Sequence, residues 1–104
     1  EEAPRLNPES TSTFFVMIYT TLTPSAPRPA TIEELHTIVD QFGQAAHRVQ
    51  IAGGDGVEIQ CAHAHGLLGG FLTPLYNKRT DEYGGNIDGR LRLCLEVIAS
   101  VRKY

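Results

Sequence analysis

The sequence predicts an α/β fold in which parallel strands alternate with helices. The run at 12–19 is rich in β-branched and aromatic residues, which is typical of a strand buried on both faces. A second apolar run at 56–61 has the length of a strand, and an amphipathic stretch at 31–52 lies between the two. A strand, a helix and a strand in this order form a crossover unit, so the two strands are expected to be parallel.

The chain is expected to begin with an irregular leader. Residues 1–11 contain two prolines and no apolar periodicity, so the α/β segment is assigned to 12–104. After strand 12–19, three prolines between 20 and 30 each remove a backbone donor, which excludes a helix or a sheet ladder. That stretch is therefore predicted to be a connection.

A helix is predicted over 31–52. Thr31 and Glu34 have the spacing of a capping box, in which each side chain bonds the backbone of the other residue. Gly53 follows as a residue that tolerates the left-handed conformation at a helix end. The apolar positions recur every three or four residues and form one stripe: Ile32, Leu35, Val39, Phe42, Ala46 and Val49.

The last third of the chain is predicted to be a long loop at 62–86 and a helix at 87–103. Glycines at Gly66–Gly70 disfavour a long helix within the loop, although a single turn is compatible with them. Asn86 can cap the final helix. Its expected apolar stripe is Leu91, Cys94, Leu95, Ile98 and Val101.

Composition indicates a soluble globular protein. The 104 residues are 41% hydrophobic and 20% charged, with a formal net charge of −3. No basic face is visible, which argues against nucleic acid as a partner. No apolar run reaches the roughly 20 residues that a membrane helix needs, and no signal peptide is evident, so a cytoplasmic location is expected.

Three motifs in the second half of the chain match a known pattern. They are Asp55–Ile59, then Phe71–Pro74, then Asn77–Gly85 with Arg90 downstream. The three resemble the FMN-dependent old yellow enzyme family of NAD(P)H:flavin oxidoreductases. The resemblance covers roughly the last two thirds of the chain.

The resemblance implies both a fold and an activity. The fold is a (β/α)8 TIM barrel of about 250 residues, of which this chain can encode only two or three strand–helix units. The activity is FMN-dependent reduction of an activated C=C bond in a small molecule such as an α,β-unsaturated carbonyl, with NAD(P)H as the reductant. The isolated chain is expected to be inactive, because a flavin held by few of its usual contacts loses most of its binding free energy.

The family's substrate residues fall on this sequence in one of two registers. In the family, a His and a His or Asn spaced three apart hold the substrate carbonyl, and a Tyr two residues later supplies a proton. Without a gap, these positions fall on Gln60, His63 and His65. An alternative register places the pair on Ala62 and His65. The resemblance therefore implies that Gln60 and His63 bind substrate and that His63 and His65 are the catalytic candidates, since imidazole exchanges protons near neutral pH.

The loop Asn77–Gly85 has a structural interpretation beside the functional one. Arg79 and Asp81 can pair, and two glycines allow positive φ, so the loop can fold back over a strand end. Arg90 is expected to be solvated or paired with Asp88, although it could also meet an anion.

Two further alternatives remain open. Cys61, His63 and His65 alternate, so a continuing strand would place three zinc ligands on one face. The chain could also be a catalytically silent remnant or an interaction module of the same fold, with unpaired sheet edges that dock on a partner or on another copy.

Residues that bind the cofactor cannot be identified from the sequence. The expected strand carries Met17 and Ile18 where the family has a flavin-binding glutamine.

Overall fold

The computed structural model describes residues 28–64 and 66–104. These residues form three helices, α2 (Ile32–Ile51), α3 (Gly66–Leu72) and α4 (Ile87–Val101). The predicted leader at 1–11 and the predicted strand at 12–19 lie outside the described residues. No described helix has both the length and the apolar character needed to cross a membrane.

Helix α2 begins and ends within one residue of the bounds predicted for it. Thr31 is the N-cap: its hydroxyl accepts from the Glu34 amide at 3.2 Å, and the Glu34 carboxylate accepts from the Thr31 amide at 2.7 Å. The capping box is therefore confirmed. Arg28 donates to Glu34 at 2.6 Å, and this pair with the Thr31 amide holds the pKa of Glu34 at about 2. At the other end, Gly53 adopts a positive φ of 86°.

Helix α4 also has the predicted cap. The Asn86 side chain accepts from the Gly89 amide at 2.9 Å. The helix ends at Val101 with Arg102 as its C-cap, so it is two residues shorter than the predicted 87–103.

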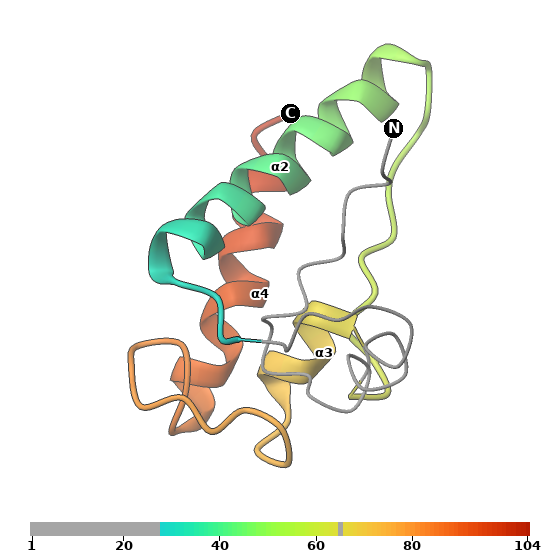
Figure 1. The fold of residues 1–104 in the computed structure, drawn as a ribbon. Coiled ribbons are helices and arrows are strands. Elements are labelled where there is room, and N and C mark those ends of the chain that lie inside the picture. The colour runs from blue at the N-terminus through green and yellow to red at the C-terminus, as the bar shows by residue number, and fades with distance from the viewer. Residues whose placement is uncertain (1–27, 65) are drawn as a thin grey trace, which may run out of the picture.

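Helices α2 and α4 pack side by side and run in the same direction (Figure 1). They are tightly packed at Gly43, where an added Cβ would overlap the Ser100 hydroxyl. Both residues are buried. Neighbouring parallel helices need a connection that runs back along them, and in Figure 1 the chain after α2 makes this return to α3. A parallel helix pair with a long return is the arrangement that a repeated strand–helix unit produces.

The return segment is not paired as a strand in the structure, so the strand predicted at 56–61 is not formed among the described residues. No strand is assigned within 28–64 or 66–104, and residues 55–62 are neither helix nor strand. A strand is defined by hydrogen bonds to a neighbouring strand. With no partner strand among the described residues, an apolar extended run remains unpaired. For the same reason the described residues show no sheet edge through which a partner could dock.

The predicted loop at 62–86 contains a helix. Helix α3 covers Gly66–Leu72, which is longer than the single turn allowed by its glycines. The helix is stabilised by burial rather than by propensity, because Leu68, Gly69, Gly70 and Phe71 are all buried. At Gly69, an added Cβ would lie 3.3 Å from the Cys61 and Ala62 carbonyl oxygens.

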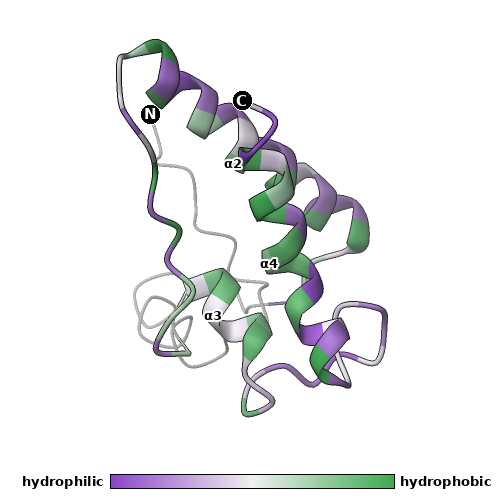
Figure 2. Ribbon diagram, turned by 180° about the vertical axis from the view of Figure 1, so that it is seen from behind, coloured by the Kyte–Doolittle hydropathy of each residue, from purple (hydrophilic) through white to green (hydrophobic). Residues whose placement is uncertain are grey.

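The core joins the three helices to the loop before α4. Its buried apolar residues are Ala30, Leu35, Leu68, Phe71, Tyr83, Leu93, Cys94 and Val97. On α4 the predicted stripe is partly wrong: Leu95 is 58% and Ile98 41% exposed, whereas Leu93 and Val97 are fully buried. Hydrophobic residues recur along the whole of α4 (Figure 2), and contact with α2 and α3 decides which of them are covered.

Candidate functional site

His63 lies on a sharp turn between the return segment and α3, and Gln60 lies three residues before it in the return segment. His63 and Ala64 have positive φ values of 65° and 51°. Left-handed conformations are uncommon for residues with a side chain, and two in succession reverse the chain direction within a few residues. The turn therefore sets where the Gln60 and His63 side chains stand.

Gln60 and His63 are both exposed. The Gln60 amide donates to the Ala62 carbonyl at 3.3 Å, and His63 makes no side-chain hydrogen bond to the described residues. The structure thus places Gln60 just before the turn and His63 on it, without joining their side chains. His65, the other catalytic candidate, lies outside the described residues.

The loop after α3 is held by a buried asparagine. The Asn77 side-chain amide donates to the Phe71 and Tyr83 carbonyls at 2.8 Å each. Its oxygen accepts from the Arg79 amide at 3.1 Å. One side chain therefore connects the end of α3 with both arms of the loop.

Arg79 and Asp81 form the ion pair expected from the sequence. Arg79 donates to both carboxylate oxygens of Asp81, at 2.6 Å in the shortest bond, and also to the Ala30 carbonyl at 2.9 Å. Its guanidinium lies 5.5 Å from the Phe71 ring centroid. The hydrogen bond from Arg79 holds the pKa of Asp81 below its usual value. The pair connects the loop to the segment that precedes α2.

Tyr83 is a core residue, which sequence analysis missed. It is 1% exposed, contacts Phe71 edge to face at 6.5 Å between ring centroids, and donates its hydroxyl to Glu96 at 2.9 Å. Burial, and then the hydrogen bond to Glu96, raise the pKa of Tyr83 above its usual value. The sequence does contain a signal for the burial of Tyr83, because this aromatic residue directly precedes Gly84 and Gly85. Glycines have no side chain, so neighbouring backbone can pack closely against the loop at that point.

Arg90 is half-buried, and its hydrogen bonds go to backbone carbonyls rather than to Asp88. A contact of Arg90 with an anion stays a prediction. Arg90 donates to the Leu72 carbonyl at 3.1 Å and to the Gly85 carbonyl at 2.7 Å. Its guanidinium therefore satisfies the carbonyl at the end of α3 and one at the start of α4. Together with Arg79, this supports the structural interpretation of the loop.

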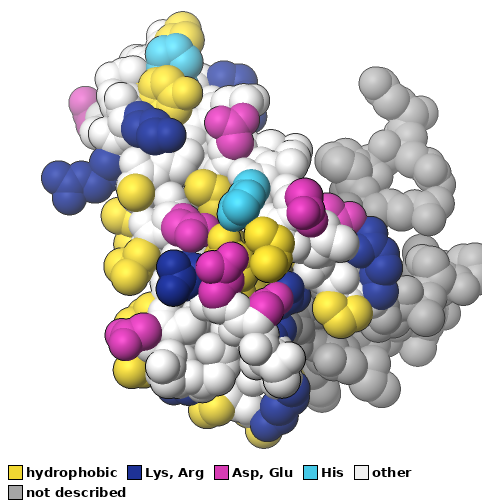
Figure 3. Space-filling view, turned by 90° about the vertical axis from the view of Figure 1, so that its left-hand side faces the viewer, with side chains coloured by type: hydrophobic (Ala, Val, Ile, Leu, Met, Phe, Trp, Pro, Cys, Tyr) yellow, Lys and Arg dark blue, Asp and Glu magenta, His cyan; other side chains and the backbone are white. Residues whose placement is uncertain are grey.

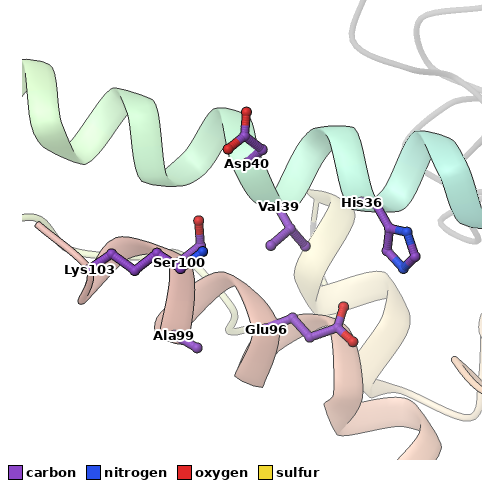
Figure 4. A pocket seen from close by; sticks show the side chains of 7 residues that line it. All are labelled: His36, Val39, Asp40, Glu96, Ala99, Ser100 and Lys103. Atoms are coloured by element: carbon purple, nitrogen blue, oxygen red, sulfur yellow. The ribbon is translucent and has the colours of Figure 1, made fainter.

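A shallow depression of about 340 Å³ lies between α2 and α4 (Figure 4). Its lining residues are His36, Val39, Asp40, Glu96, Ala99, Ser100 and Lys103. Val39 points from α2 toward α4, whereas Asp40 points away from it (Figure 4). On this side of the molecule, acidic and basic side chains surround a small apolar patch (Figure 3).

A flavin does not fit the described residues by themselves. The depression between α2 and α4 and a second depression beside it on α4 are both open to solvent. A ring cofactor needs an enclosed, largely apolar cleft instead. Within residues 28–64 and 66–104, no three His, Cys, Asp or Glu side chains are placed to hold a metal ion. The zinc hypothesis also needs His65, so it remains a prediction.

Comparison with known proteins identifies the chain's relatives. Residues 2–104 match the profile of the NADH:flavin oxidoreductase / NADH oxidase family. A metal reductase of Desulforamulus reducens is 49% identical over 82 residues, which are 79% of this chain and 12% of that protein. 12-oxophytodienoate reductase 2 of Arabidopsis thaliana is 46% identical over 74% of this chain and 20% of its own length.

Solved structures agree with the sequence comparison. Morphinone reductase has a TM-score of 0.71 and 42% identity over 76% of this chain and 21% of its own. Histamine dehydrogenase from Rhizobium sp. 4-9 has a TM-score of 0.73 and 34% identity over 80% of this chain and 13% of its own. This chain therefore spans between about a tenth and a fifth of these relatives. The match over nearly the whole chain confirms the resemblance found in the motifs, and the chain belongs to the FMN-dependent NADH:flavin oxidoreductase / NADH oxidase family.

Proposed function

We propose that this chain is a segment of a (β/α)8 barrel enzyme that reduces an activated C=C bond with FMN as cofactor and NAD(P)H as reductant. The observation that carries the proposal is the family match over 2–104. Three relatives support the substrate class, because cinnamate reductase, 12-oxophytodienoate reductase 2 and morphinone reductase are each named for an unsaturated carbonyl compound. The parallel pair of α2 and α4 fits two consecutive helices on the outside of such a barrel.

The segment's part in this reaction is to present the substrate-binding turn. We assign the Gln60 amide and the His63 imidazole to the carbonyl oxygen of the substrate, where a hydrogen bond withdraws electrons and makes the β-carbon more electrophilic. His65 is assigned to proton supply. Bound FMN supplies hydride chemistry to the whole enzyme. The described residues by themselves do not enclose a site for it.

The loop from Asn77 to Arg90 is assigned to positioning. Arg79 donates hydrogen bonds to the Ala30 carbonyl and the Asp81 carboxylate. Arg90 donates to the Leu72 and Gly85 carbonyls. Because the donors of these two arginines are bound within the described fold, we assign the loop to holding α3, the segment before α2 and the start of α4 together.

We place the protein in the cytoplasm, with a small molecule as its substrate. Two thiols that are not joined in a disulfide fit a reducing compartment.

A segment exchange tests the proposal. Residues 28–104 replace the matching segment of morphinone reductase, and the purified chimaera is examined for flavin absorbance and for NADH-dependent reduction of 2-cyclohexenone. We expect a yellow protein that reduces the enone. A chimaera that folds and binds FMN but oxidises NADH without reducing the enone would favour the silent remnant.

Single variants of the chimaera test the assigned residues. Gln60→Ala and His63→Ala should each lower kcat/KM for the enone by about tenfold to a thousandfold, the usual range for one lost electrophilic donor. His36→Ala is the matched control, because it removes an exposed imidazole from α2. Equal activity in His63→Ala and His36→Ala would contradict the assignment of His63.

A further inference from the structure

The two cysteines of the chain meet across the core. Cys94 lies on the buried face of α4 and Cys61 on the return segment, two residues before His63. Their sulfur atoms are 3.9 Å apart although 33 residues separate them in sequence. Sulfur contact at this distance places both thiols within reach of one another without a change of fold.

We propose that Cys61 and Cys94 are a redox pair that closes to a reversible disulfide when the protein meets hydrogen peroxide. The proposal does not depend on the function proposed above. A disulfide needs a sulfur separation of about 2.05 Å, so the sulfurs must approach by roughly 2 Å from 3.9 Å. Rotation about the Cα–Cβ bond of either residue moves a sulfur by that amount.

The surroundings of the two thiols differ and define an order of reaction. Cys61 is half-buried, whereas Cys94 is buried and its S–H is also 3.9 Å from the Leu68 carbonyl. Burial, and then the neighbouring Cys61, raise the pKa of Cys94 to about 12. The thiolate is the nucleophile, and Cys61 is the more accessible thiol, so Cys61 reacts with peroxide first.

Two balanced steps complete the oxidation. The Cys61 sulfur attacks peroxide, the O–O bond breaks, and a sulfenic acid and one water form. The Cys94 sulfur then attacks the Cys61 sulfur, the S–O bond breaks, and the hydroxyl leaves as water with the proton from Cys94. Peroxide is reduced to two waters, and the two thiols lose two protons and two electrons.

The closed pair would connect the turn to α4. Cys61 stands two residues before His63 and Ala64, which have positive φ, so a covalent bond to the helix restrains the segment that presents Gln60 and His63. The expected consequence is a link between the redox state of the pair and the geometry of the turn. Such transient bonds are the type of disulfide found in reducing compartments.

The test uses the full chain and peroxide. Under native conditions, equimolar peroxide should lower the intact mass by two hydrogens, join the peptides that contain Cys61 and Cys94, and leave no thiol that alkylates; dithiothreitol should restore both thiols. The closing step should become faster as pH rises from 7 to 9. Sulfinic acid on Cys61 with a free Cys94, or a disulfide between two chains, would overturn the proposal.

A second measurement separates the folded pair from chance encounter. The effective concentration of the two thiols is measured against glutathione, once in native buffer and once in 6 M guanidinium chloride. If the fold aligns the pair, the value in native buffer should be higher by about tenfold or more. Equal values would overturn the proposal. Cys94→Ser should allow Cys61 to proceed to sulfinic acid, and Cys61→Ser should leave Cys94 unmodified by the same peroxide.

Discussion

Substitution of Arg79 by alanine is expected to destabilise the described fold by about 3 kcal/mol. The Arg79 side chain is 9% exposed and donates to the Asp81 carboxylate and to the Ala30 carbonyl. It also lies over the Phe71 ring. Its removal therefore affects the loop, the segment before α2 and the core at once.

The magnitude follows from the groups that remain behind. Ala30 is buried, and a buried carbonyl left without a donor costs about 1–3 kcal/mol. Asp81 is one third exposed and recovers water, so loss of its partner costs only about 1 kcal/mol. Loss of the contact with Phe71 adds about 0.5–1 kcal/mol.

The contribution of Asp81 depends on pH in a defined direction. Because Arg79 lowers the pKa of Asp81 in the folded chain below its unfolded value of 3.8, the stabilisation is present above about pH 4. It is lost as pH falls through the folded-state pKa. The difference in the free energy of unfolding between the wild-type chain and Arg79→Ala should therefore become smaller as the pH is lowered.

Urea denaturation followed by circular dichroism measures these differences at pH 7 and pH 3. Arg48→Ala is the matched control, because Arg48 is exposed on α2 and should cost less than about 0.5 kcal/mol. Equal midpoints for Arg79→Ala and Arg48→Ala at pH 7 would refute the reasoning. So would a difference that grows at pH 3.

Three other substitutions test separate contacts. Gly89→Ala places a Cβ against the Gly84 carbonyl oxygen and should lower the free energy of unfolding, measured in urea, by at least about 2 kcal/mol. The control is Gly56→Ala, whose Cβ meets nothing within 4 Å and which should change that free energy by less than about 0.5 kcal/mol. Similar values for the two variants would contradict the close packing of the loop on α4. Tyr83→Phe leaves Glu96 without its donor and should lower the free energy of unfolding by about 1 kcal/mol. Since the folded-state pKa of Tyr83 is raised, wild-type stability should fall above about pH 10, and the stability of the variant should fall less. Parallel pH curves for the two proteins would show that ionisation of Tyr83 is not linked to folding. Thr31→Ala removes one half of the capping box and should lower the free energy of unfolding by about 1 kcal/mol. Thr37→Ala, on the exposed side of α2, is the control. An equal loss of stability in the two variants would mean that the cap is not formed.

Local signals in the sequence were enough to predict the helix ends. Thr31 with Glu34, and Asn86 before α4, act through bonds within three residues. Such bonds form wherever the helix forms. The bounds of α2 and α4 therefore differ from the predicted ones by at most two residues.

Features that depend on distant neighbours were predicted less well. Residues 56–61 have the composition of a strand, but a ladder needs a second strand beside them. On α4, Leu95 and Ile98 share an apolar face just as Leu93 and Val97 do, and nothing within the helix indicates which face α2 and α3 will cover. Burial of Leu95 and Ile98 would require elements beyond the described residues.

The candidate site divides in the same way. A motif indicated that Gln60 and His63 matter, and the structure shows both side chains exposed, with His63 on the turn and Gln60 just before it. The backbone targets of Arg90 were not predictable, because they depend on how closely α3, the loop and α4 approach. For the burial of Tyr83, the glycine pair that follows it was the available local signal.

The central claim is that residues 56–61 and helices α2 and α4 belong to a parallel strand–helix barrel. A crystal structure of the morphinone reductase chimaera tests it most directly. The account predicts that 56–61 pairs as a parallel strand between two neighbours while α2 and α4 keep their contact at Gly43 and Ser100. An antiparallel or helical 56–61, or helices that separate at that contact, would contradict it.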